Sequence, residues 1–420
     1  MHYPLLLSFI LVLTISLEVL APPPYHALVA PIFKHTNANT SLYSIALNNY
    51  TLNNYEHYII DVDAPFTWYK GELSPRALSC DTPACTVARS YRSPLCPIAN
   101  DIGGDDQCRC LVTPVNPVTM SCAVSQLTYK DFSLYWTNGR FRTGSMGFSQ
   151  WYASSAPPSL VQSLPKEAIG VGAFSWSSIS LLYQFTYPSG LIARKFALCL
   201  PSSSRARGVI LFGDGPYYLL PPPNFDAAGV LSYTPLYGDP TSPGYFINLT
   251  GISVNGKAIN VARNAFDFHV NASARLSSIV PYTTLRSDIY SVFLKNFKKA
   301  ARGIAQAKKV APFSLCFNTT TIRSRGHRLR IPQINLMLGN GEQWTVDTLN
   351  SIKQVNNDVG CLAFVDGGEM TKQAVVIGTY QMENNFLLFD LDQSRLGFSS
   401  SPLPYGTSCG GFNFTVGSYF

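Results

Sequence analysis

Short apolar runs separated by turn-forming residues dominate this chain and predict mainly β structure. Residues 43–47 and 57–61 combine β-branched and aromatic side chains, and an asparagine-rich segment lies between them, as is typical of a hairpin. Runs of the same kind recur later in the chain, at residues 245–249, 252–254, 375–378 and 386–390. Their length and composition indicate buried strands.

Helical periodicity is confined to a few segments. The clearest helix is expected to begin near Thr284, because apolar residues follow at three- and four-residue spacing and lysines occupy the other face. Its apolar stripe is interpreted as core, not as a ligand site. Residues 159–168 and 178–185 have the composition of short helices. Residues 70–125 are rich in Cys, Pro and Gly and predict loops that need covalent staples.

The length of 420 residues predicts two lobes. Proline and glycine punctuate residues 237–244, which are the expected interlobe linker. The expected division is a signal peptide at residues 1–21, an N-terminal lobe at 25–238, a C-terminal lobe at 244–400 and a tail at 401–420. In each half an apolar strand leads to a turn with candidate chemistry, and an apolar run with glycine follows later, at residues 170–172 and 376–378.

The N-terminus and the cysteines both indicate export. Residues 5–17 are apolar and Ala21 is a small residue near a cleavage point, which predicts a signal peptide; a membrane anchor is the alternative. The ten cysteines suit five disulfides, and a zinc site around Cys108 and Cys110 is disfavoured because no paired Cys-x-x-Cys motif occurs. The cysteines are Cys80, Cys85, Cys96, Cys108, Cys110, Cys122, Cys199, Cys316, Cys361 and Cys409.

The chain contains six Asn-x-Ser/Thr sequons, which are compatible with export because N-linked glycans are added in the secretory pathway. Each is a candidate glycan site, and an unmodified surface asparagine is the alternative at each. The sequons are Asn39, Asn49, Asn248, Asn271, Asn318 and Asn413.

Composition and charge indicate which classes of binding partner are expected. Hydrophobic residues make up 46% of the chain and charged residues 13%, so a large core is expected. The net charge of +7 is spread along the chain and favours solubility and anionic partners over nucleic acid. No phosphate-binding Gly-x-x-x-x-Gly-Lys-Ser/Thr loop is present, and the sequence places no histidine near a candidate serine nucleophile. No cofactor and no metal is expected.

Two turns carry the candidate chemistry. Asp61-Val62-Asp63 after the strand at 57–61 looks like half of an aspartic-protease site, and Ser277-Ser278-Ile279 stands where the second acid is needed. Such a protease uses two adjacent carboxylates that share one proton, and a serine hydroxyl cannot hold that charge. We therefore predict a protein that does not cleave peptides, with Asp61 and Ser277 as vestigial positions. The alternative is that Asp63 or Asp267 takes the place of the missing second acid.

Residues 58–68, 276–285, 311–317, 386–398 and 409–411 together resemble a plant pepsin-like family. Its members include wheat-type xylanase inhibitors, xyloglucan endoglucanase inhibitor proteins, extracellular dermal glycoprotein and basic 7S globulins. The resemblance implies an all-β, bilobal pepsin-like fold with a few short helices, secreted to the cell wall or apoplast. It also implies that Cys316 pairs with Cys361 and Cys199 with Cys409. The six early cysteines are left to pair among themselves, with fifteen formal connectivities.

The resemblance further implies a role in plant defence, with a microbial glycoside hydrolase as protein partner. In some members a basic loop enters the sugar cleft, where an arginine meets paired catalytic carboxylates. The corresponding segment here is residues 321–330, with Arg323, Arg325, His327 and Arg328; a solvated basic loop is the alternative.

Two departures from the family pattern narrow the expectation. Tyr405 occupies the place of a histidine in the wheat-type inhibitors, which argues against xylanase as the target; packing beside Cys409 is its alternative role. Gly71 and Ser154 occupy two positions where relatives carry cysteine, which suggests one deleted bridge. The other functions kept open are a storage protein or peptide-binding cell-wall glycoprotein, and a residual acid protease.

Overall fold

The computed structural model describes residues 27–36, 41–49, 52, 54–72, 76–91, 93, 95–96, 108–186, 192–222, 225–239, 241–268, 273–322, 324–325 and 328–417. The expected signal peptide at 1–21 lies outside these ranges.

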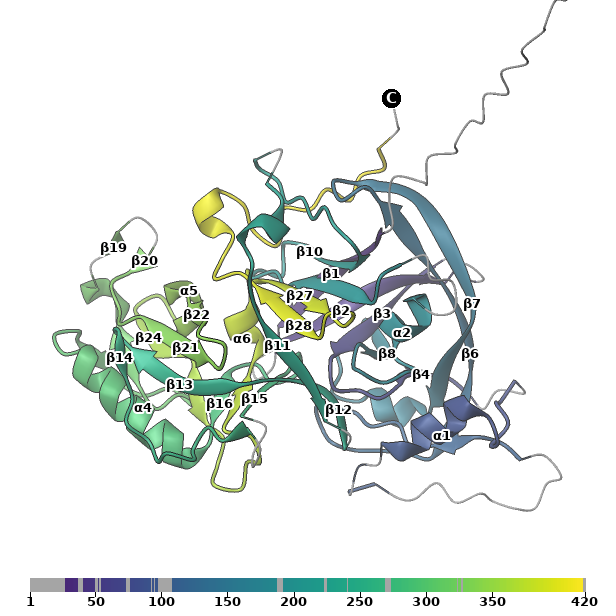
Figure 1. The fold of residues 1–420 in the computed structure, drawn as a ribbon, viewed down its shortest axis with the longest axis horizontal. Coiled ribbons are helices and arrows are strands. Elements are labelled where there is room, and N and C mark those ends of the chain that lie inside the picture. Colours follow the sequence, from purple (N-terminus) through teal and green to yellow (C-terminus); the bar gives the residue numbers. More distant parts are fainter. Residues whose placement is uncertain are drawn as a thin grey trace, which may run out of the picture.

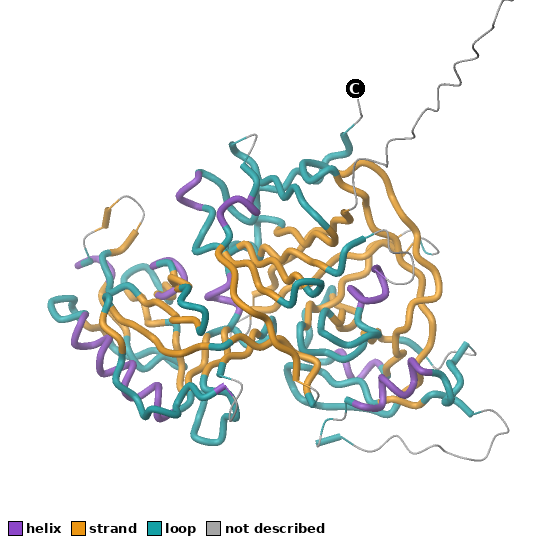
Figure 2. Tube along the Cα trace, viewed as in Figure 1, coloured by secondary structure: helices purple, strands orange, loops and turns teal. Residues whose placement is uncertain are grey.

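The chain folds into two lobes built mainly from β-strands, with short helices at their edges (Figures 1 and 2). The prediction of an all-β, bilobal fold is thereby confirmed. The first lobe is the purple-to-teal part of Figure 1 and the second is the green part, while the yellow C-terminal strands lie between them.

The first lobe is a strongly curved sheet whose long hairpin, β6–β7, forms one outer wall (Figure 1). Its core packs aromatic residues such as Phe132, Trp151 and Phe185. Its strands are β1 Ala27–Thr36, β2 Ser41–Asn49, β3 Asn54–Asp61, β4 Thr67–Lys70, β5 Leu111–Val112, β6 Ser125–Thr137, β7 Arg142–Ala156, β8 Ala168–Ala173, β9 Lys195–Cys199 and β10 Gly208–Gly213. Its helices are α1 Pro83–Ser90, α2 Leu181–Thr186 and the 3₁₀ turns η1 Pro158–Val161 and η2 Ala227–Val230.

The second lobe combines strands of the large sheet that continues from the first lobe with three smaller sheets and one longer helix, α4 Ser287–Ala300. The strands that follow η2 are β11 Ser232–Asp239, β12 Ser242–Ile247, β13 Leu249–Val254, β14 Lys257–Ala258, β15 Ala274–Leu276, β16 Thr283–Leu285, β17 Gln306–Ala307, β18 Cys316–Asn318, β19 Ser324–Arg325, β20 Arg328–Leu329, β21 Ile334–Leu338, β22 Gln343–Val346, β23 Ile352–Gln354, β24 Val359–Leu362, β25 Phe364–Asp366, β26 Val375–Ile377, β27 Phe386–Asp390 and β28 Arg395–Phe398. The remaining short helices are η3 Thr319–Thr321, α5 Thr348–Ser351, α6 Thr379–Met382 and η4 Leu403–Tyr405.

The internal duplication expected from the sequence is present in the strand pairing. In the first lobe β8 lies between β3, to which it is parallel, and β4, to which it is antiparallel. In the second lobe β26 lies in the same way between β15 and β16. Each lobe thus presents one strand–turn–strand unit at its centre, and the two turns carry Asp61 and Ser277.

The C-terminal strands bind the two lobes together. β27 pairs with β9 of the first lobe, and β28 pairs with β11. At this junction the rings of Phe196 and Phe389 stack with centroids 4.4 Å apart. Nearby, the buried Lys34 ammonium lies 2.7 Å from Glu383 Oε1, so an ion pair also connects β1 to the segment after α6.

Three local expectations differ from the structure. The linker segment at 237–244 is largely the β11–β12 hairpin, because its proline and glycine residues mark a turn between paired strands. The helix α4 begins at Ser287, since the preceding residues pair as β16. Residues 159–168 form only the 3₁₀ turn η1 and then enter β8, whereas residues 178–185 partly coincide with α2.

All ten cysteines are paired. The early cysteines form Cys80–Cys108, Cys85–Cys110 and Cys96–Cys122, and the late ones form Cys199–Cys409 and Cys316–Cys361, as the resemblance implied. The first three bridges hold α1 and β5 in the loop-rich region that the sequence marked. Within the described part of the chain, no helix combines the length and hydropathy needed to cross a bilayer.

Candidate functional site

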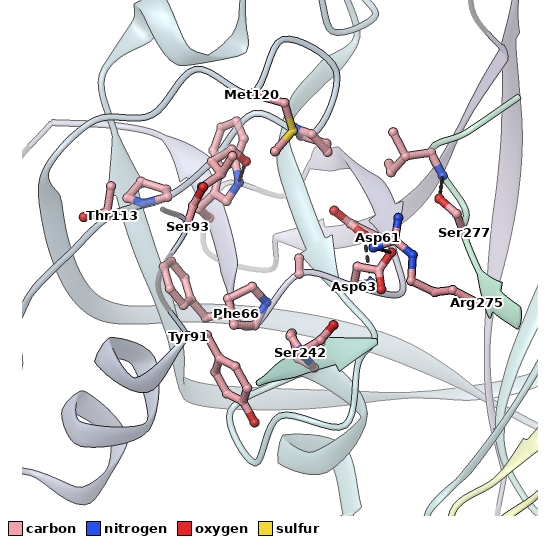
Figure 3. Close-up of a pocket in the computed structure, with 18 of the residues that line it drawn as sticks. Asp61, Asp63, Phe66, Tyr91, Ser93, Thr113, Met120, Ser242, Arg275 and Ser277 are labelled. Atoms are coloured by element: carbon pink, nitrogen blue, oxygen red, sulfur yellow. Dashed lines mark hydrogen bonds and ion pairs between the residues drawn. The ribbon is translucent and has the colours of Figure 1, made fainter. Parts of the chain in front are cut away.

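The two central turns face a shared cleft between the lobes. Asp61 ends β3 and Ser277 directly follows β15, and both line a cavity of about 380 Å³ (Figure 3). Aromatic and apolar side chains form the opposite wall, among them Phe66, Tyr91 and Met120. The strand pairing places the turns here, because each follows the strand that pairs in parallel with β8 or β26.

The hydroxyl of Ser278 connects the turns across the lobe boundary. It accepts a hydrogen bond from the Val62 N–H at 3.1 Å and donates one to the Ile60 carbonyl at 2.7 Å. All of these groups are buried, so each bond satisfies a polar group that water cannot reach. Val62, in the turn of the first lobe, has no hydroxyl group. The side-chain bridge between the two turns is therefore made by Ser278 of the second lobe.

Asp61 and Ser277 use their side chains within their own turns. The Asp61 carboxylate accepts the Asp63 N–H at 2.8 Å. The Ser277 hydroxyl accepts the N–H groups of Ile279 and Val280, each at 3.2 Å. Over the described residues, no hydrogen bond joins the Asp61 carboxylate to the Ser277 hydroxyl.

A second carboxylate does line the cleft, but it comes from the same turn as Asp61. Asp63 Oδ2 lies 3.7 Å from Nη1 of Arg275, which sits on β15 and reaches toward the acids (Figure 3). The carboxylate is also covered by the β11–β12 hairpin, because a Cβ on Gly244 would lie 1.9 Å from Asp63 Oδ1. Asp267, the other acid considered from sequence, is not among the residues that line this cavity.

Burial determines the ionisation of these acids. Desolvation raises the pKa of Asp61 to about 7, and the charge of Asp63 adds to this, whereas the Asp63 N–H and Arg275 oppose it. Desolvation also raises the pKa of Asp63, against the attraction of Arg275. Below neutral pH the acid pair therefore holds a proton, with a guanidinium beside it.

The loop that forms the far wall of the cleft is fixed to the first lobe. The Trp68 indole donates to the Val115 carbonyl at 3.0 Å. The fully buried Asn116 amide donates to the carbonyls of Leu160 and Gln162, and the disulfide Cys96–Cys122 joins the end of this loop to residue 96. The cleft is therefore a preformed pocket with an anchored wall.

The arginine-rich segment forms a small hairpin at the edge of the second lobe (Figure 1). Its strands β19 and β20 place Arg325 opposite Arg328 and pair with no other sheet. Arg323 and His327 lie outside the described residues.

Tyr405 belongs to η4 in the tail. Its side chain is 48% exposed, and its ring stacks on Phe225 with centroids 5.0 Å apart. Tyr405 therefore packs against Phe225, whereas the sequence suggested that it packs beside Cys409.

Three features of the site were missed from sequence. Arg275 stands in the cleft and was not named from the sequence, whereas Ser278 was named only as part of the turn at 277–279 and not as a bridge between the lobes. Both positions depend on pairing between distant strands. The fold also brings His35 and His57 to the Ser44 hydroxyl, at 2.7 and 3.0 Å. Ser44 is fully buried, so this trio is structural and no hydrolase site. The described residues contain no cluster of three or more potential metal ligands.

Replacement of Ser278 by alanine should destabilise the protein by roughly 2–3 kcal/mol, since a buried N–H and a buried carbonyl both lose their partner. The Ser278→Thr variant keeps the hydroxyl and serves as the matched control. Urea unfolding of the three proteins measures the effect. Equal stability of the alanine variant and the parent would show that the bridge contributes nothing.

Replacement of Asp61 by asparagine should stabilise the protein at pH 7.5 by roughly 2–4 kcal/mol and have little effect near pH 3.5. The folded-state pKa of about 7 exceeds the ordinary value of 3.8, so the parent loses stability as pH rises between these values. Asparagine removes the charge and keeps the oxygen that accepts the Asp63 N–H. Thermal unfolding across this pH range tests the sign, with the exposed Asp358→Asn as control; a destabilised variant at pH 7.5 would contradict it.

Comparison with known proteins identifies the family to which this chain belongs. The family models described as xylanase inhibitor N-terminal and xylanase inhibitor C-terminal match residues 44–214 and 244–400. Chitinase CLP from Oryza sativa subsp. japonica is 34% identical over 93% of this chain and 92% of its own, and basic 7S globulin 2 from Glycine max is 28% identical over 99% and 98%.

Among solved structures, that of edgp superposes with a TM-score of 0.83 at 30% identity, covering 93% of this chain and 99% of its own. The basic 7S globulin from soybean superposes with a TM-score of 0.76 at 26% identity, covering 92% and 98%. The pepsin-like architecture expected from the sequence is that of these neighbours. With both family models matched and a rice relative aligned over nearly its full length, the chain belongs to the plant xylanase-inhibitor family of pepsin-like proteins.

Proposed function

We propose that this protein is a secreted, proteolytically inactive member of its family that binds and inhibits microbial cell-wall glycoside hydrolases. A xyloglucan endoglucanase is a better target than a xylanase. The observation that carries the proposal is the separate hairpin β19–β20, which sets two arginines opposite each other at the edge of the second lobe.

The inactivity follows from the chemistry of the cleft. Peptide hydrolysis on this fold needs one protonated and one ionised carboxyl group on either side of a water molecule. Across the cleft from Asp61 the second turn offers the Ser277 hydroxyl, which is engaged with its own backbone. Arg275 lies on that side as well, and it presents a guanidinium to the acids where a protease of this fold needs a second carboxyl group.

The hairpin is suited to an acidic cleft in a partner. Like charges at directly opposite strand positions reduce the stability of a hairpin, so the Arg325–Arg328 register has no evident benefit for folding. Against two catalytic carboxylates the same arrangement is favourable, because each guanidinium can donate two parallel hydrogen bonds to a carboxylate. Glycoside hydrolases present such a carboxylate pair in an open groove.

The tail element η4 lies on the other side of α5 from the hairpin. β20 packs against α5. Tyr405 lines a surface hollow together with Thr345 and Asp347, and Asp347 caps the N-terminus of α5 by accepting the Leu349 N–H at 3.0 Å. The two segments that the resemblance connects with inhibition therefore flank one helix. Tyr405 offers a neutral phenol and no imidazolium, which favours a target other than a xylanase.

The second candidate is a storage or peptide-binding glycoprotein without inhibitory activity. This second candidate is supported by the similarity of the chain to gamma conglutin and basic 7S globulin. The anchored, aromatic cleft of about 380 Å³ would be the site that takes a peptide.

Replacement of Arg325 by alanine should weaken inhibition of a fungal xyloglucan endoglucanase at least tenfold, because a charge-assisted contact in a partly desolvated groove is lost. Arg302→Ala removes an exposed arginine from the turn after α4 and should leave inhibition unchanged. Inhibition constants measured at acid pH, with a xylanase as second enzyme, give the comparison. Full inhibition by the Arg325 variant would exclude the hairpin as the inhibitory element.

The same preparations separate the other functions. A folded parent protein that inhibits no glycoside hydrolase in a panel, and binds peptides, would favour the storage or peptide-binding role. Peptide hydrolysis near pH 4 that disappears in the Asp61→Ala variant would establish a residual protease and overturn the proposed inactivity.

A further inference from the structure

The six sequons are not equivalent once the chain is folded. Asn39 and Asn271 lie outside the described residues, and four sequons remain to compare: Asn49, Asn248, Asn318 and Asn413. An N-linked glycan is attached to the side-chain nitrogen, Nδ2, of asparagine. The environment of this one atom therefore decides whether the folded protein can accommodate a sugar.

Asn318 and Asn413 share one local geometry. Asn318 Oδ1 accepts the N–H and the hydroxyl of Thr320, at 3.0 and 2.7 Å. Asn413 Oδ1 accepts the same two groups of Thr415, at 3.0 and 2.8 Å. In both sequons the threonine is exposed and holds the amide by its oxygen. Both asparagines are partly exposed, and among the described residues their Nδ2 atoms donate to no other group, so a sugar on this nitrogen would break no hydrogen bond.

Asn49 has the opposite arrangement. Its side chain is 6% exposed, and Nδ2 donates to Glu56 Oε1 at 3.0 Å. Glu56 is itself buried and also binds the Lys130 ammonium at 2.9 Å and the Tyr58 hydroxyl at 2.6 Å. A sugar on Asn49 would need space inside this network and would leave a buried carboxylate with one partner fewer, at a cost of several kcal/mol.

Asn248 lies between these cases. Its Nδ2 packs against the chain at Gly339, where an added Cβ would be only 2.4 Å from the nitrogen. The amide is therefore crowded, and it lacks the threonine-held geometry of the two open sequons.

We propose that Asn318 and Asn413 carry N-linked oligosaccharides, whereas Asn49 is unmodified in the folded protein despite a complete Asn-Tyr-Thr sequon. The inference rests on the proposed export, because the donor is a lipid-diphosphate oligosaccharide of the secretory pathway. Nδ2 attacks C1 of the first sugar, the C–N bond forms, the C1–O bond to the diphosphate breaks, and the amide gives up a proton. A chain modified at Asn49 before folding loses the Asn49–Glu56 hydrogen bond and has to place a sugar in this buried network, so we expect it to be depleted from the folded population.

The two sites lie in different parts of the molecule. Asn318 is the N-cap of η3, only a few residues before β19, so its glycan stands near the base of the arginine hairpin. Asn413 belongs to the tail after Cys409, and its neighbours Phe412 and Phe414 turn their rings toward each other, with centroids 4.8 Å apart. The glycans thus extend from surfaces that are remote from the core network around Glu56.

The test is site-specific glycan mapping on the full chain, produced in plant cells and collected from the medium. Peptide:N-glycosidase A in ¹⁸O-water converts each glycosylated asparagine into labelled aspartate, and peptide mass spectrometry locates the label. We expect label at Asn318 and Asn413 and unlabelled Asn49. Label at Asn49 in most of the folded protein, or its absence from both Asn318 and Asn413, would overturn the proposal.

Sequon variants provide an independent readout. Thr320→Ala and Thr415→Ala should each increase electrophoretic mobility by one glycan. Thr51→Ala destroys the Asn49 sequon, retains the Asn49 amide and should leave mobility unchanged. A mobility shift in the Thr51 variant alone would contradict the assignment. Hydrolase inhibition by the deglycosylated protein is measured separately, so a failure of the glycan assignment and a failure of the proposed inhibition are distinguishable.

Discussion

The hydroxyl of Ser278 joins two turns that belong to different lobes, and the geometry of the cleft depends on that connection. Because it accepts the Val62 N–H and donates to the Ile60 carbonyl, it fixes the ends of β3 and β15 relative to each other. A hydroxyl is the smallest side-chain group that can do both at once. The neighbouring Ser277 hydroxyl takes no part in this bridge, because it accepts the N–H groups of Ile279 and Val280 within its own turn. The role of Ser278 is therefore structural.

The rest of the interlobe contact is independent of the cleft. β27 continues the first-lobe sheet through β9, and the Lys34–Glu383 pair fixes β1 to the segment after α6. Burial raises the pKa of Glu383, and the attraction of the Lys34 ammonium opposes that rise. These contacts connect the two lobes without involving the hairpin β19–β20, which forms a separate two-stranded sheet.

Much of the fold was predictable because its signals are local. Apolar runs located the buried strands β2, β3, β12, β13, β26 and β27, and the repeated strand–turn–strand pattern predicted the duplicated core. Errors arose where local signals are ambiguous: proline and glycine at 237–244 mark a hairpin turn as readily as a linker, and Thr283–Leu285 reads as the start of a helix until β25 and β26 supply partners. Arg275 could not be placed in the cleft from sequence, since its position is set by pairing with β26, one hundred residues away along the chain.

The sequence singled out Asp61 and Ser277, and the structure places both on one cavity. The presence of Asp63 and Arg275 beside Asp61 changes the electrostatics of that cavity in a way that the sequence did not indicate. A lone buried carboxylate would stay protonated in mildly acidic solution, whereas here the guanidinium draws the pair toward ionisation while burial opposes it. The result is a pocket whose charge varies near neutrality, and such a pocket can bind a polar group.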